Sequence, residues 1–294
     1  MLSEDCFKNI LECPWCNDSV ERSLELYATN HGAKTRKCEK CGFVYSDRIL
    51  NKKGLQVFWD KYESKVHNQT AEMQNQRDKM YRVEFEYIDN LVGVTGKKVL
   101  DVGCAAGGFL DLFHAKGAQC FGTEIGREAA ELAAKKYKVF MGDLSELITE
   151  ERFDIIIFRG VIQYFINPKE CFAKATSLLN DGGILYITSS PNSESLCFNL
   201  FKEQFRLPVG VCDYWAYSEK LLTKFLKELG MHLFTTKYFY EETPYANVKE
   251  DILKVANAIT LVEEGKKPEY KSPLFYDNML TLIYVYRGDI YYEY

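Results

Sequence analysis

Apolar side chains follow a helical period over residues 51–92. In the first part of this stretch they share one helix face, at Leu55, Phe58, Trp59 and Tyr62. In the second part they recur at roughly helical spacing, at Met73, Met80, Phe85, Ile88 and Leu91. Gly93 and Gly96 interrupt the pattern, as glycines do at helix ends. Residues 51–92 are therefore predicted to be helical.

From Lys97 the pattern changes to short apolar runs separated by helical stretches. Five runs predict strands, at residues 98–103, 118–124, 138–143, 153–160 and 182–190. The fourth run is almost entirely apolar, which is typical of a strand buried on both faces. Helices are predicted between the runs at residues 107–117, 127–137 and 167–179. This alternation predicts an α/β fold with a doubly wound, Rossmann-like, mostly parallel sheet.

The last third of the chain predicts a different connection. Ser218 and Gly230 are suitable residues to begin and end a helix over 218–230. Strands are predicted at residues 231–240 and 278–287. Because no crossover helix is expected between their β-rich parts, these two strands predict a late antiparallel pairing. Residues 241–278, with a helix over 248–264, are treated as an insertion that covers the acceptor pocket.

Composition limits the partners and the location of the protein. The chain has 294 residues, of which 47% are hydrophobic, and no apolar stretch approaches the roughly 20 residues of a membrane span. The first ten residues lack the features of a signal peptide, so we expect a cytoplasmic protein. The net charge is −5, and residues 1–60 hold nine basic and nine acidic residues. A nucleic-acid partner is not expected, because phosphate contacts require a positive surface. Nothing indicates an oligomeric state.

Four of the ten cysteines have the spacing of a metal site. Cys13 and Cys16 form one CxxC pair, and Cys38 and Cys41 form a second, with 21 residues between the two pairs. Two such pairs supply the four thiolates of a tetrahedral zinc site. A site with four protein ligands is closed, so the zinc is expected to be structural. The remaining six cysteines are interpreted as small packed side chains.

A loop of small residues follows the first predicted strand. Gly103, Ala105, Gly107 and Gly108 leave space for a ligand beside the backbone. Glu124 ends the next strand, where a carboxylate can bind both ribose hydroxyls of a nucleoside. Asp143 ends the third strand and can accept a hydrogen bond from adenine. This pattern suits a dinucleotide or S-adenosylmethionine (SAM), and Asp101 favours SAM because its charge suits a cationic ligand and repels a pyrophosphate.

Five segments in this order carry a family resemblance: DVGCAAGGFL, FGTEIG, MGDLSEL, FDIIIFRGVIQYF with NP, and GGILYITSSPN. They resemble class I SAM-dependent methyltransferases, especially bacterial enzymes that modify sugars and other cell-surface or secondary-metabolite precursors. The resemblance covers about residues 95–240. It implies a cofactor site formed by Asp101, Gly103, Cys104, Ala105, Gly107, Glu124, Ile125, Asp143, Leu144 and Arg159. It also implies a zinc-ribbon module at 1–50, a helical connector at 51–92 and a catalytic domain at 93–294.

The sequence departs from that family where its general bases are found. Gln163 and Tyr164 stand where related enzymes often have Glu-His, and Asp213 lies in a segment where they often have another His. We therefore name Asp213 as the candidate base and Tyr164 as a residue that positions the substrate. Arg159 is expected to pair with an anionic group of the substrate. The aromatic residues 290–294 are interpreted as a substrate lid, a subunit contact or ordinary packing.

Three functions fit this sequence. The first is methyl transfer, with O-transfer favoured, to a small molecule such as a sugar or nucleotide-linked sugar. The second is an RNA or protein methyltransferase whose zinc ribbon binds the macromolecule, which the balanced charge of residues 1–60 argues against. The third is a SAM-binding scaffold that has lost its catalytic groups.

Removal of a structural zinc is expected to loosen residues 1–50 before it affects SAM binding, because the two sites use different segments. Limited proteolysis with and without a chelator measures this. Equal resistance of the N-terminal residues after verified zinc loss would contradict a structural zinc.

Overall fold

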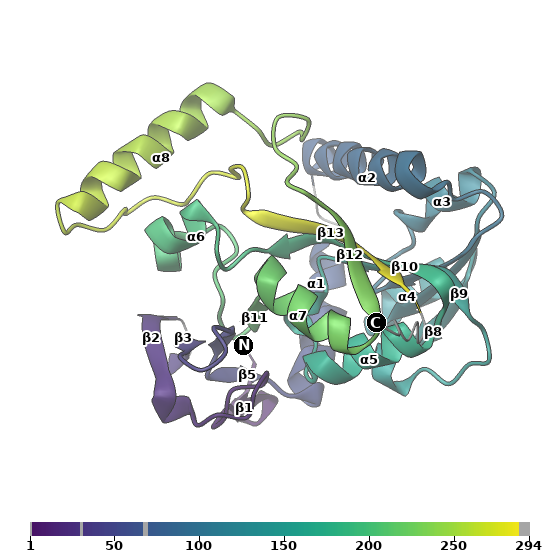
Figure 1. The fold of residues 1–294 in the computed structure, drawn as a ribbon, viewed down its shortest axis with the longest axis horizontal. Helices are drawn as coiled ribbons and strands as arrows, with labels where there is room; N and C mark the ends of the chain where they lie inside the picture. Colours follow the sequence, from purple (N-terminus) through teal and green to yellow (C-terminus); the bar gives the residue numbers. More distant parts are fainter. Residues whose placement is uncertain (1, 30–31, 67–69, 288–294) are drawn as a thin grey trace, which may run out of the picture.

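Seven strands form the central sheet of the protein (Figure 1). The computed structural model describes residues 2–29, 32–66 and 70–287. The order of the strands across the sheet is β12-β13-β10-β9-β6-β7-β8. Along the chain they are β6 (Lys98–Val102), β7 (Gln119–Glu124), β8 (Lys138–Met141), β9 (Phe153–Arg159), β10 (Leu179–Pro191), β12 (Met231–Lys237) and β13 (Met279–Tyr286).

One strand of this sheet runs against the others. The pairs β6–β7, β7–β8, β6–β9 and β9–β10 are parallel. By contrast, β13 is antiparallel to both β10 and β12, and Val285 lies opposite Ile184 on one side and His232 on the other. The predicted mostly parallel sheet with a late antiparallel strand is therefore confirmed.

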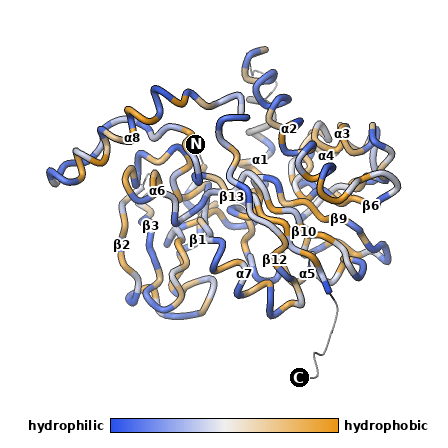
Figure 2. The backbone as a smooth tube through the Cα atoms, turned by 45° about the horizontal axis from the view of Figure 1, so that its top comes forward, coloured by the Kyte–Doolittle hydropathy of each residue, from blue (hydrophilic) through white to orange (hydrophobic). Residues whose placement is uncertain are grey.

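Both faces of the sheet are covered, which explains the continuous apolar run of β9. Side chains of one face, including Ile156 and Phe158, pack with α5, α7 and the N-terminal residues. Side chains of the other face, including Ile155 and Ile157, pack with α2 and α3. All four of these side chains are fully buried. Figure 2 shows the hydrophobic residues concentrated along the strands around β9 and β10.

The helices begin and end largely where the sequence indicates. They are α1 (Lys52–Val66), α2 (Ala71–Val92), α3 (Leu110–Ala115), α4 (Arg127–Ala133), α5 (Pro168–Ser177), α6 (Leu196–Phe201), α7 (Glu219–Glu228) and α8 (Val248–Glu263). Ser218 caps α7 by accepting a hydrogen bond from the Leu221 N–H. Helix α4 is shorter than predicted, because the chain turns after Ala133 and brings the Tyr137 ring against the Gly107 backbone.

The N-terminal residues 2–50, here called the N-terminal module, form two small sheets. Strands β1 (Phe7–Asn9) and β5 (Arg48–Leu50) pair with each other. The second sheet has the order β11-β4-β3-β2 and contains β2 (Ser23–Ala28), β3 (Lys34–Cys38), β4 (Val44–Ser46) and β11 (Trp215–Ala216). Its last strand, β11, therefore comes from a part of the chain far from the other three.

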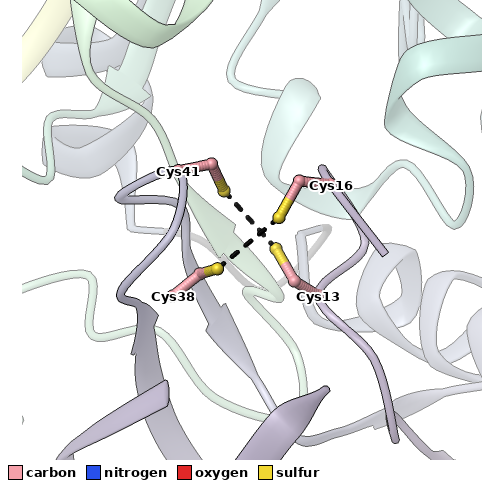
Figure 3. A group of neighbouring side chains, drawn as sticks. All are labelled: Cys13, Cys16, Cys38 and Cys41. Carbon is pink, nitrogen blue, oxygen red and sulfur yellow. Dashed lines mark hydrogen bonds between the residues drawn. The ribbon is translucent and has the colours of Figure 1, made fainter. Parts of the chain in front are cut away.

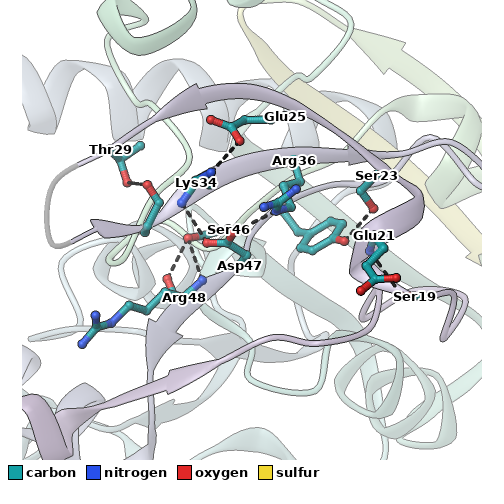
Figure 4. Close-up of polar contacts among 12 residues, drawn as sticks. Ser19, Glu21, Ser23, Glu25, Thr29, Lys34, Arg36, Ser46, Asp47 and Arg48 are labelled. Atoms are coloured by element: carbon teal, nitrogen blue, oxygen red, sulfur yellow. Dashed lines mark hydrogen bonds and ion pairs between the residues drawn. The ribbon is translucent and has the colours of Figure 1, made fainter.

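Polar contacts fix the strands of the N-terminal module to one another (Figure 4). The Asp47 carboxylate accepts hydrogen bonds from the Lys34 backbone N–H and from Arg36 Nε, each at 2.8 Å. Lys34 Nζ also lies 2.8 Å from Glu25 on the neighbouring strand. Because Asp47 follows β4 while Lys34 and Arg36 lie on β3, this carboxylate holds the two strands in register.

Helix α8 lies apart from the central sheet and packs on α6 (Figure 1). Val255 and Ala258 of α8 are buried with Phe198 and Phe201 of α6. Among the described residues, no helix has the length and apolar character needed to cross a membrane. The aromatic residues 290–294 lie outside the described part of the chain.

Candidate functional site

A cleft of about 640 Å³ opens at the carboxyl ends of β6, β7, β8 and β9. This volume suits a ligand of the size of a nucleoside cofactor. Seven of the predicted cofactor residues line the cleft: Gly103, Ala105, Glu124, Ile125, Asp143, Leu144 and Arg159. Helix α2 forms another wall, with Gln74, Arg77, Asp78, Tyr81 and Arg82. Asp101, Cys104 and Gly107 do not line the cleft; Asp101 lies in β6, and the other two lie in the loop after it.

The loop after β6 has the backbone that the small residues predict. Gly103, Ala105 and Gly107 have φ angles of 74°, 47° and 85°. A Cβ atom on Gly103 would lie 2.6 Å from the Val161 side chain, so the neighbouring loop excludes any larger residue there. Ala105 adopts the left-handed conformation in spite of its side chain, at a cost of about 1 kcal/mol.

Glu124 compensates for that conformation. Its carboxylate accepts hydrogen bonds from the N–H groups of Ala105 at 2.8 Å and Gly126 at 2.7 Å. Burial raises the pKa of Glu124, and these backbone hydrogen bonds oppose the increase. Each carboxylate oxygen can accept a further hydrogen bond, so the group can still receive ribose hydroxyls from the cleft.

Asp101 is a buried carboxyl group whose Oδ1 has no hydrogen-bond partner among the described residues. Burial raises its pKa to about 8, the nearby Arg159 lowers it, and Glu124 and Glu84 raise it further. An unpaired buried carboxylate is costly, and a cationic ligand nearby would relieve this cost. A ligand with a positive charge, such as SAM, would suit this carboxyl group.

Asp143 holds the turn at the end of the third strand. Its Oδ1 atom accepts hydrogen bonds from the Ser145 N–H at 2.9 Å and the Ser145 hydroxyl at 2.5 Å. It thereby caps a short 3-10 helix, η4 (Leu144–Glu146), whose first residue is buried and lines the cleft. Asp143 and Leu144 thus offer a polar atom and an apolar surface next to each other, as an adenine ring requires.

The sequence analysis did not identify Glu84 on α2. This fully buried residue accepts hydrogen bonds from Arg159 Nε at 2.6 Å, Thr188 Oγ1 at 2.9 Å and Ser189 Oγ at 2.6 Å. The Arg159 guanidinium also lies 4.3 Å from the centre of the Tyr81 ring. The charge of Arg159 is therefore paired within the protein. The sequence contains one signal that could have identified Glu84: it is an acidic residue directly beside Phe85, on the apolar face of a predicted helix.

The two candidate catalytic residues Tyr164 and Asp213 lie next to each other. Tyr164 ends a short helix, η5 (Ile162–Tyr164), lines the cleft, and has its ring centre 5.1 Å from that of Trp59 on α1. Asp213 lies behind Tyr164 and outside the lining. Burial raises the pKa of Asp213 to about 6, and a hydrogen bond from Tyr164 opposes the shift.

The four cysteines converge on one point, as Figure 3 shows. The Sγ atoms of Cys13, Cys16, Cys38 and Cys41 lie within 4.8 Å of one another. The two pairs Cys13–Cys41 and Cys16–Cys38 are each separated by 3.6 Å. A tetrahedron with Zn–S bonds of about 2.3 Å has edges of about 3.8 Å, so this donor set fits a zinc ion.

Comparisons with known proteins identify the family of the part of the chain that forms most of the cleft. Residues 73–234 match the family described as "Methyltransferase domain". The ubiquinone biosynthesis O-methyltransferase of Azoarcus sp. (strain BH72) is 22% identical over 165 residues, which are 51% of this chain and 71% of that protein.

Two solved structures share the fold. Magnesium protoporphyrin IX methyltransferase from Synechocystis PCC 6803, with bound S-adenosylhomocysteine (SAH), is 14% identical, with a TM-score of 0.56 over 80% of this chain and 100% of that one. The Burkholderia thailandensis 1,6-didemethyltoxoflavin-N1-methyltransferase is 15% identical, with a TM-score of 0.54 over 89% of this chain and 98% of that one. At these identities the likeness concerns the fold alone.

Replacement of Asp101 by Asn is expected to weaken SAM binding and to stabilise the ligand-free protein. In the unfolded chain the Asp pKa is about 3.9, and in the folded chain it is about 8. The contribution of Asp101 to stability is therefore present at low pH and is lost as the pH rises from about 4 to 8. Chemical denaturation should show Asp101→Asn more stable than the wild type by at least about 1 kcal/mol at pH 8, and by less at pH 5. Equal stabilisation at both pH values would contradict this account of Asp101.

Proposed function

The chain belongs to the methyltransferase domain family and is a SAM-dependent methyltransferase, and we propose that its acceptor is a small molecule with a hydroxyl group. The observation that carries this proposal is the Tyr164–Asp213 pair, in which Tyr164 lines the cleft and forms a side-chain hydrogen bond with Asp213. A tyrosine hydroxyl in contact with a buried carboxylate can receive a proton and pass one on.

SAM supplies a methyl group on a sulfonium, and the protein has to hold and orient it. In this proposal Glu124 binds the ribose, and Asp143 and Leu144 bind the adenine. The loop from Gly103 to Gly107 surrounds the methionine part, and Asp101 lies near its positive charge. Arg159, paired with Glu84, packs against the Tyr81 ring in the wall of the cleft. Arg159 therefore has a structural role that does not depend on contact with the substrate.

The proposed proton path runs through two side chains. The acceptor hydroxyl gives its proton to the Tyr164 oxygen while its own oxygen forms the bond to the methyl group. At the same time the Tyr164 proton passes to Asp213, and the proton returns to solvent after the product leaves. Asp213 therefore acts through Tyr164, since Tyr164 lines the cleft and Asp213 does not.

The acceptor is proposed to carry a compact ring. Trp59, Tyr81, Tyr164 and Phe165 all line the cleft, and aromatic side chains bind the apolar face of a ring well. The family resemblance favours a sugar or nucleotide-linked sugar as this ring. The Azoarcus relative is a ubiquinone biosynthesis O-methyltransferase, and this makes a phenol the second candidate. A structural zinc at the four cysteines is part of the same proposal.

Methyl-labelled SAM and a host extract divided into metabolites and macromolecules test the acceptor class. Label is expected in the metabolite fraction, and mass spectrometry of that fraction then separates methylated sugars from methylated phenols. Label confined to RNA or protein would overturn the small-molecule proposal. Binding of SAM with no label in any fraction would favour a scaffold.

With the labelled acceptor as substrate, kcat/KM is expected to rise tenfold per pH unit below a pKa of about 6 and to be level above it, because Asp213 must be ionised. Asp213→Asn and Tyr164→Phe should each lower kcat by about 10²-fold or more, with little change in SAM affinity. Glu170→Gln, an exposed change on α5, serves as the control. An unchanged kcat in Asp213→Asn would remove this residue from the mechanism.

A further inference from the structure

Residues 209–217, here called the shared segment, connect the N-terminal module to the catalytic cleft. On one side the segment completes the four-stranded sheet, with Trp215 opposite Tyr45 and Ala216 opposite Val44. On the other side it lies against η5, the short helix that ends in Tyr164. Asp213 lies inside this segment.

The N-terminal module fixes the segment through three further hydrogen bonds. Thr35 Oγ1 donates to the Val209 carbonyl oxygen at 2.7 Å, and the Val209 N–H donates to the Tyr27 hydroxyl at 3.1 Å. The Ser46 N–H donates to the carbonyl oxygen of Tyr214 at 2.9 Å. Thr35 is fully buried, so these groups cannot exchange their partners for water.

The same segment fixes η5. The Tyr214 N–H donates to the Gln163 carbonyl oxygen at 3.0 Å, and Trp215 Nε1 donates to the Phe165 carbonyl oxygen at 2.6 Å. The Tyr217 hydroxyl donates to the Ile162 carbonyl oxygen at 3.0 Å. The carbonyl groups of Ile162, Gln163 and Phe165, on both sides of Tyr164, are thus held by side chains or N–H groups of the shared segment.

An aromatic residue in or next to each CxxC pair packs against the shared segment. Trp15, between Cys13 and Cys16, has its ring centre 5.8 Å from that of Tyr217. Phe43, two residues after Cys41, lies 5.8 Å from Trp215 and 5.2 Å from Tyr217. The four thiolates therefore determine where two rings meet the shared segment, and close packing transmits that position.

We propose that the metal-bound N-terminal module is the positioning element of the acceptor site, because it holds the shared segment and so brings Asp213 against Tyr164. This rests on the proposed function for the role of that pair. The proposal goes beyond a structural zinc, because in it the metal also determines the position of Asp213 relative to Tyr164. The cofactor loops after β6, β7 and β8 make none of these hydrogen bonds, so cofactor binding should not require them.

The test uses the 294-residue chain with zinc bound, and SAH as the probe of the cofactor site. Tyr27→Phe combined with Thr35→Val removes the two side-chain hydrogen bonds to Val209 and keeps the side-chain shapes. Ser19→Ala is the matched control, because it removes a hydrogen bond to the Glu21 N–H in the same module, away from the shared segment. A second sample of the wild type is stripped of zinc and then given Zn²⁺ alone.

Two measurements report on the shared segment: hydrogen exchange of its backbone and the titration of the Asp213 carboxyl group. Hydrogen exchange of peptides covering 160–166 and 209–217 should become about tenfold faster in the double variant and in the stripped protein. The ¹³C signal of the Asp213 carboxyl, assigned by its loss in Asp213→Asn, should show a titration midpoint that falls from about 6 toward about 3.9 as water enters. Tyr164, Cys212, Tyr214 and Tyr27 are the titratable groups around it.

SAH affinity should change by less than about threefold, because sites that share no partners behave independently. Zn²⁺ added to the stripped protein should restore the slow hydrogen exchange and the Asp213 titration midpoint of the wild type. Ser19→Ala should change neither quantity. The proposal is overturned if the Asp213 midpoint stays in place in both the double variant and the verified zinc-free protein. It is also overturned if SAH binding is lost in parallel with the segment. None of these measurements needs an acceptor, so a failure of the proposed function would be seen separately, as an absence of methyl transfer.

Discussion

Burial of β6 and β9 on both faces is the constraint on which the rest of the structure depends. Helices and the N-terminal module cover the two faces, so these central strands meet a ligand only at their carboxyl ends. Every polar group at the carboxyl edge of these strands then lies beside a buried apolar core. The carboxylates of the cleft therefore need partners supplied by the backbone, by Arg159 or by a bound molecule. Glu124 uses two backbone N–H groups, Glu84 uses Arg159 and two hydroxyls, and Asp101 Oδ1 has no hydrogen-bond partner among the described residues.

The sequence was sufficient for features that depend on neighbouring residues. The alternation of runs identified the strands of the sheet, and the loop from Gly103 to Gly107 indicated the edge of the sheet at which the cleft opens, because both patterns are local. Cys13 and Cys16, like Cys38 and Cys41, could also be recognised from spacing alone. The four Sγ atoms then converge as expected, and the parallel sheet has its antiparallel strand next to β10.

What could not be predicted depends on residues far apart in the chain. Glu84 meets Thr188 and Ser189 only after the chain has crossed the sheet several times. The pairing of Ala216 with Val44 leaves no mark in either short segment, since two residues are too few to show a strand period. The division of residues 1–50, 51–92 and 93–294 into separate units remains a prediction. Residues of α2 line the cleft, and the N-terminal module shares its core with the sheet.

The position of β11 late in the chain also affects how the protein folds during synthesis. Thr35 and its partner Val209 are 174 residues apart, so the N-terminal sheet is synthesised long before its edge strand leaves the ribosome. Until then β4 presents unpaired backbone groups, and such an edge can pair with a second nascent chain. Contacts of this separation form slowly, because a long loop must close first. Cysteine pairs that gather early around a metal would keep this exposed intermediate compact, so metal supply during translation would affect the yield of folded protein as well as its final stability.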